Sequence, residues 1–146
     1  MPLEYYYMSG NGTKDVSDDF KRGHVVGKQY ELVHDVYLIQ YCDDDELRLE
    51  RFLIFTPTSY SKIEIIPKGI RFKVCTVLAK TSFGSELCCQ NILANLIDEQ
   101  GNSMPKTNSS GKIVSLHVTD LFNDTFQMPL QDWTFIPISK FIKEIE

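Results

Sequence analysis

The sequence lacks the features that mark membrane proteins and secreted proteins. No apolar run approaches the ~20 residues that a membrane-spanning helix needs. The first ten residues, MPLEYYYMSG, contain neither the basic start nor the apolar stretch of a signal peptide. These absences predict a protein without a membrane segment that works inside the cell, in the nucleus or the cytoplasm.

Motifs of catalysis and nucleotide binding are absent as well. The chain contains no phosphate-binding Gly-rich loop, no dinucleotide fingerprint and no G-x-S-x-G nucleophile motif. Its three histidines, His24, His34 and His117, are scattered and lie in no metal or triad motif. We therefore predict a non-catalytic protein with no metal, no cofactor and no small-molecule substrate.

The four cysteines follow no zinc-binding or disulfide pattern. There is no C-x-x-C, and adjacent Cys88 and Cys89 point to opposite faces if they lie in a strand. We interpret them as small buried apolar side chains in a reducing compartment. The acidic run from Asp43 to Glu46 lacks the alternating spacing of a calcium loop, so it is predicted to be a solvated hairpin tip.

Length and composition describe one ordinary globular domain. The chain has 146 residues, of which 42% are apolar and 24% charged, so a folded core is expected. The net charge of −5 argues against a protein that coats nucleic acid non-specifically. We expect residues 1–25, which are polar and glycine-containing, to form a flexible arm, and residues 26–146 to form a single mainly β domain.

The apolar pattern predicts strands along most of this domain. Alternation in the run 71–81 places Phe72, Val74, Thr76 and Leu78 toward the core. Other strand-like runs, rich in β-branched and aromatic residues or alternating in character, occur at 36–42, 47–56, 62–66, 112–118 and, more briefly, 126–130.

The segment 68–102 is the most informative one, because it predicts a long, bent hairpin. Its first half is basic, a Gly-containing turn follows, and its second half ends in the turn sequence DEQGN. Residues 86–98 also fit a helix in part. Glu86 and Gln90 interrupt the apolar stripe that this helix needs, so we favour a strand.

The C-terminal segment has a different period. Its apolar residues recur at i, i+3, i+4 and i+7 after Pro137, which predicts an amphipathic helix. This helix either caps the β body or packs against a protein partner. The residues that form its stripe are Ile138, Phe141, Ile142 and Ile145.

A basic strip is the strongest sign of a ligand. Between residues 57 and 80, five cations accompany a single carboxylate, giving +4 in a chain of −5. Cations along a strand beside aromatic rings are the elements of single-strand nucleic-acid binding. The alternative is a solvated strand face whose lysines keep an edge from aggregating. The candidate nucleic-acid-binding residues are Lys68, Arg71, Lys73, Lys80, Tyr60 and Phe83.

The pattern K-G-x-x-F-x-V-x-x-V-x-A-K, then a Gly turn and L-I-D-E-Q-G-N, resembles the first hairpin of OB-fold proteins. The expected C-terminal helix is similar to that of small subunits in replication-protein-A-like and telomere-capping complexes, where such helices mediate subunit pairing. The resemblance implies an OB-like barrel that serves as a non-catalytic subunit of a nucleic-acid-associated complex. It is carried by Lys68, Gly69, Phe72, Val74, Val77, Lys80, Gly84 and the run 96–102.

A second resemblance leaves an alternative open. The segment NLIDEQGNSMPKTNSSGKIVSL is similar to a turn between strands of immunoglobulin-like β-sandwiches. The fold expected is therefore mainly β, either an OB-like barrel or a β-sandwich. The alternative function is a protein-interaction domain, or a viral or structural component, with no nucleic-acid role.

Overall fold

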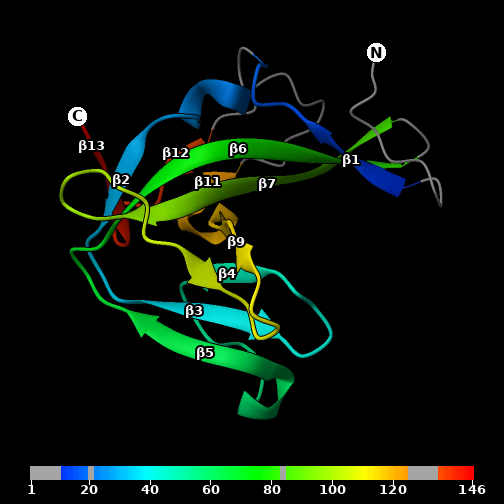
Figure 1. The fold of residues 1–146 in the computed structure, drawn as a ribbon. Coiled ribbons are helices and arrows are strands. Elements are labelled where there is room, and N and C mark those ends of the chain that lie inside the picture. Colours follow the sequence, from blue (N-terminus) through cyan, green and yellow to red (C-terminus); the bar gives the residue numbers. More distant parts are fainter. Residues whose placement is uncertain (1–10, 20–21, 83–84, 125–134) are drawn as a thin grey trace.

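The fold is built from β-strands, as seen in a computed structural model that describes residues 11–19, 22–82, 85–124 and 135–146 (Figure 1). The strands are β1 (Asn11–Asp15), β2 (Gln29–Leu32), β3 (Val36–Tyr41), β4 (Leu47–Glu50), β5 (Tyr60–Ile66), β6 (Arg71–Ser82), β7 (Ser85–Ile97), β8 (Lys106–Thr107), β9 (Ile113–Val114), β10 (Leu116–His117), β11 (Phe122–Asp124), β12 (Phe135–Pro137) and β13 (Ile142–Ile145). Three short 3-10 helices complete the described elements: η1 (Arg22–Val25), η2 (Pro57–Ser59) and η3 (Thr119–Leu121). The prediction of a mainly β protein is confirmed.

One nine-stranded sheet dominates the molecule. Its order is β13-β2-β6-β7-β10-β4-β3-β5, with β1 added beside β6, and β10 lies parallel to β4. The end strands β13 and β5 do not pair with each other, so the sheet formed by the described residues is not a closed barrel. In Figure 1, β6 and β7 form the upper part of the molecule and β5 its lower edge.

The long hairpin predicted for residues 68–102 is confirmed as β6 and β7. Their register shifts between Val74 and Thr76 and again between Ala79 and Thr81. The first bulge reverses the side-chain alternation, because it inserts one extra residue. Val77 and Ala79 therefore face the core, while Thr76 and Leu78 are only partly buried, which corrects the orientation predicted for this strand.

A cluster of buried side chains holds the two halves of the sheet together. It contains Leu38 and Leu49 from the lower strands and Val77 from the upper hairpin. Tyr30 stacks on Phe72 with ring centroids 5.4 Å apart. Burying large apolar side chains of this kind contributes roughly 1.5–3 kcal/mol each.

The described part of the N-terminal segment is attached to this body. β1 pairs with β6 over five residues, and the amide of Val16 donates a hydrogen bond to the carbonyl of Val77 at 2.9 Å. Val16 and Val25 are buried in the core. Residues 11–19 and 22–25 thus do not form a free arm, since their apolar side chains pack under the hairpin; residues 1–10 lie outside the described part.

The C-terminal helix predicted from the stripe at Ile138, Phe141, Ile142 and Ile145 is wrong. The amides of Phe141 and Ile142 both donate to the carbonyl of Ile138. These two hydrogen bonds form a single helix-like turn that goes no further. The chain then extends as β13 and pairs antiparallel with β2. This pairing satisfies the edge of β2, which a helix would leave open.

The strand predicted over 47–56 ends early, at Glu50. The backbone amide of Arg51 donates to Oδ2 of Asp120 at 2.7 Å, so a side chain replaces the next sheet partner. Residues 51–56 leave the sheet as a loop. The hairpin of β3 and β4 with its acidic tip is confirmed, and so is a strand over 62–66, within β5.

The run predicted as a strand over 112–118 forms two short strands, β9 and β10, separated at Ser115. The predicted run 126–130 lies outside the described residues.

Asn108 and Gln40 are the two buried polar side chains in the described part, and they tie the β8–β9 ribbon to the acidic hairpin tip. Asn108 donates to the carbonyl of Asp45, and Gln40 to that of Asp44. None of the helices in the described segments is long and apolar enough to cross a bilayer.

Candidate functional site

The lower edge of the molecule carries a set of exposed apolar side chains, which we call the apolar surface. Four of them are consecutive in the loop after β4, and two lie on β5. Their exposed fractions range from 37% to 68%, far above what a core residue shows. The apolar surface consists of Phe52, Leu53, Ile54, Phe55, Ile63 and Ile65.

Strand register explains why Ile63 and Ile65 point outward. In the β3–β5 ladder, Ile65 is opposite Tyr37 and Leu38 is opposite Glu64. Side chains alternate between the two faces of a sheet, so Tyr37, Ile63 and Ile65 share one face. The other face presents Leu38 to the core, which leaves the isoleucines of β5 on the outside.

The loop from Arg51 to Phe55 is held at both ends. At its start, the Phe52 ring meets the Phe141 ring edge-on at 5.9 Å. At its end, the amide of Phe55 donates to the Tyr60 hydroxyl at 3.1 Å, and the Phe55 ring meets the Tyr41 ring edge-on at 5.8 Å. The exposed side chains therefore belong to a positioned segment.

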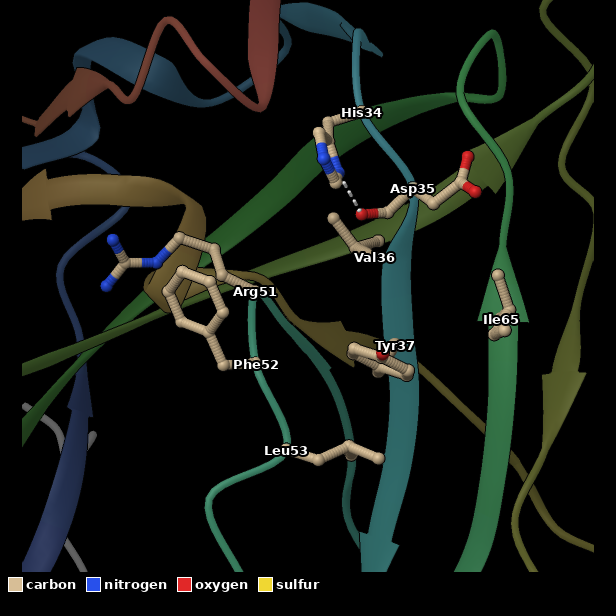
Figure 2. A pocket seen from close by; sticks show the side chains of 8 residues that line it. All are labelled: His34, Asp35, Val36, Tyr37, Arg51, Phe52, Leu53 and Ile65. Atoms are coloured by element: carbon tan, nitrogen blue, oxygen red, sulfur yellow. Dashed lines mark hydrogen bonds between the residues drawn. The ribbon is translucent and has the colours of Figure 1, made fainter.

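A hollow of about 480 Å³ lies between this loop and β3 (Figure 2). Its walls come from three places: the start of β3, the beginning of the loop, and β5. It is open to solvent on one side and mixes apolar walls with a few charged groups. The lining residues are His34, Asp35, Val36, Tyr37, Arg51, Phe52, Leu53 and Ile65.

Electrostatics beside the loop are unusual at Glu50. Burial raises the pKa of this carboxyl to about 7, and the neighbouring Asp120 carboxylate adds to the shift, while Arg48 and Arg51 oppose it. Burial also raises the pKa of Tyr41, with a further contribution from Glu50. Glu50 therefore keeps its proton to a higher pH than an exposed glutamate does, because its surroundings solvate a charge poorly.

The predicted nucleic-acid-binding residues are only partly brought together. Arg71 and Lys73 share the outer face of β6, as expected, and Lys68 is exposed in the preceding turn. Nε of Arg71 lies 3.4 Å from the carboxylate of Glu31. The hollow beside Arg71 is also lined by Asp98 and Glu99, so carboxylates surround this cation.

The aromatic members of that predicted set are separate from these cations. Tyr60 is buried and stacks on Tyr41 at 5.4 Å, at the end of β5 away from the turn that leads to Arg71. The side chain of Lys80 and the whole of Phe83 lie outside the described structure.

The predicted partner-binding residues lie mostly inside the molecule. Phe141 and Ile142 are buried, and Ile138 packs against the core. The Phe141 ring also contacts the His34 ring at 4.9 Å. Ile145 is partly buried on β13. They form no exposed stripe, since the segment is extended where a helix was expected.

Within the described residues, no group of three or more acidic, histidine or cysteine side chains is arranged to hold a metal ion. The residues that sequence reasoning missed are Phe52 to Phe55, which were assigned to a strand. One signal was available: four consecutive apolar residues cannot all face one core in a strand, where faces alternate.

A scan against models of protein families, a search of curated proteins and a search of solved structures each found no match to this chain.

Proposed function

We propose that this protein is a non-catalytic interaction domain that binds a protein through the apolar surface. The observation that carries the proposal is the cluster of six exposed apolar side chains on an anchored loop and the adjacent sheet edge. Soluble proteins rarely expose contiguous apolar patches without a use for them, and such patches mark interaction sites.

The chemistry of the apolar surface favours a protein over nucleic acid as its partner. Phosphate recognition needs cations aimed at the ligand. Arg51 is the cation among the residues that line the hollow, and its guanidinium is already bonded to Asp120. Phenylalanine side chains with depleted charge are what protein interfaces carry at their centres.

A matched pair of substitutions tests the proposal. Ile54→Glu places a charge within the apolar surface, and Ile136→Glu places one on β12, where another isoleucine is exposed. The immobilised proteins are exposed to an extract of cells that contain this protein naturally. We expect a retained protein to be lost with Ile54→Glu and kept with Ile136→Glu. Equal retention by both variants contradicts the proposal.

The second candidate is the OB-like role in a nucleic-acid-associated complex. It is favoured by one observation: Arg71, Lys73 and Lys143 lie on the same outer face of the sheet. Glu31 is directly opposite both Lys143 and Arg71 in the strand ladders, and residues opposite each other share a face. Binding of a labelled single strand, measured at about 50 and 200 mM salt, tests it. A direct role requires affinity that falls steeply with salt and weakens in Arg71→Ala with Lys73→Ala.

A further inference from the structure

We infer that the apolar surface is completed by a second copy of this chain, joined edge to edge through β5. The inference rests on the proposed function, because it names the partner of the same surface. β5 ends the sheet, and no other strand in the described ranges pairs with its outer edge (Figure 1). An edge strand presents backbone N–H and C=O groups that can pair with another strand.

The sequence of β5, YSKIEII, is self-complementary in one antiparallel register. A two-fold axis normal to the sheet keeps the same face of both copies on the same side. Directly paired residues must therefore lie on the same face of β5, which requires the axis to pass between two copies of the same residue. With the axis at Ile63, Lys62 of each copy stands opposite Glu64 of the other. Opposite charges directly across a strand pair attract, and this register contains two such pairs.

Neighbouring registers lose this match. An axis at Lys62 brings the two lysines together, and an axis at Glu64 brings the two carboxylates together. Like charges directly opposite each other destabilise a strand pair. The charge pattern of β5 therefore selects the register centred on Ile63.

Lys62 and Glu64 are already held in place within one chain. Nζ of Lys62 donates to the carbonyl of Thr107 at 2.9 Å, and Nζ of Lys106 lies 2.9 Å from Oε2 of Glu64. Charged residues on the core side of an edge strand normally discourage pairing with another strand. Here Lys62 of one copy faces Glu64 of the other, so each charge has a partner of opposite sign. The same two residues oppose pairing with a strand that lacks this charge pattern.

The same register extends the apolar surface. Ile63 of one copy meets Ile63 of the other on the outer face. Because the axis is normal to the sheet, the outer faces of both copies lie on the same side. The isoleucines of β5 from both copies then lie side by side, flanked by the two anchored loops. The apolar surfaces of the two copies then form one continuous surface, in which the two Ile63 side chains cover each other.

Sedimentation equilibrium of the 146-residue chain tests the inference. We expect a dimer whose population rises with concentration. Lys62→Glu alone and Glu64→Lys alone each create two like-charge pairs, and both variants should sediment as monomers. Mixed one to one, they should form a heterodimer, because each variant then faces the opposite charge at both positions. Lys143→Glu, on the other edge strand, should leave the dimer unchanged.

Three results overturn the inference: an unmodified chain that stays monomeric, a dimer that survives both charge reversals, or a mixture that stays monomeric when each variant is folded. Circular dichroism and melting of each variant establish that it is folded. If the unmodified chain is monomeric while Ile54→Glu still abolishes retention of another protein, the inference fails and the proposed function stands. If the unmodified chain is a dimer and Ile54→Glu abolishes no retention of another protein, the inference stands and binding of a different protein partner is contradicted.

Discussion

Arg51 binds Asp120 through its backbone and its side chain at once. The amide of Arg51 donates to Oδ2 at 2.7 Å, and its Nε and Nη2 donate to Oδ2 and Oδ1 at 3.2 Å each. Asp120 belongs to η3, which is 69 residues away in the sequence. This contact ends β4 and fixes the point at which the exposed loop begins.

Removing this anchor should release the loop. We expect Asp120→Ala to lower the free energy of unfolding by about 1–3 kcal/mol, because a partly buried ion pair and a backbone hydrogen bond are lost together. Protease cleavage between Arg51 and Phe55 should become faster. Asp43→Ala, at the exposed hairpin tip, is the control and should change stability by less than about 0.5 kcal/mol. Equal cleavage of both variants contradicts the anchoring role.

Glu50 should make stability depend on pH in a defined direction. Its folded pKa of about 7 lies above the ordinary value of 4.5, so the folded protein binds the proton more tightly than the unfolded chain. The contribution of Glu50 to stability is therefore fully present below about pH 4.5 and is lost as pH rises through about 7.

Glu50→Gln should remove that dependence. Relative to the unmodified protein, the variant should gain about 1–3 kcal/mol at about pH 8 and little at about pH 5. Urea unfolding at the two pH values gives the free energy of unfolding of each protein. The difference between the two proteins at each pH removes the contributions of the titratable groups that they share. The same difference at both pH values shows that Glu50 titrates with an ordinary pKa.

Phe141 should behave as a core residue. Its side chain is 7% exposed and contacts the rings of His34 and Phe52. Phe141→Ala should cost about 3–5 kcal/mol, as for other buried aromatic side chains. The exposed Lys143, two residues later, gives the control Lys143→Ala, with an expected change under about 0.5 kcal/mol. Thermal melting of both variants measures the change in stability. If Phe141→Ala destabilises the protein as little as Lys143→Ala does, Phe141 is again a candidate interface residue.

Local patterns were enough to predict the strands that depend on them. The alternating and β-branched residues of 36–42 and 62–66 form β3 and β5, and the turn signals around 68–102 delimit a real hairpin. These features follow from neighbouring residues alone, because turn chemistry and two-residue periodicity act over short stretches of chain.

Long-range contacts account for the failures. The end of β4 depends on Asp120, which no local pattern connects to Arg51. The bulge between Val74 and Thr76 depends on how β6 matches β7, so it exchanged the predicted core positions. At the C-terminus, Ile142 and Ile145 extend because β2 offers an open edge, although their spacing also fits a helix.

The most direct test of the central claim is a contact measurement at Ile54. A photoreactive amino acid replaces Ile54 in one version of the protein and Ile136 in another, and both are irradiated in the cells that contain the protein. The apolar surface predicts a covalent protein adduct from position 54 and none from position 136; mass spectrometry then distinguishes a second copy from another protein. Adducts in equal yield from both positions, or none from position 54, contradict the claim that this surface binds a protein.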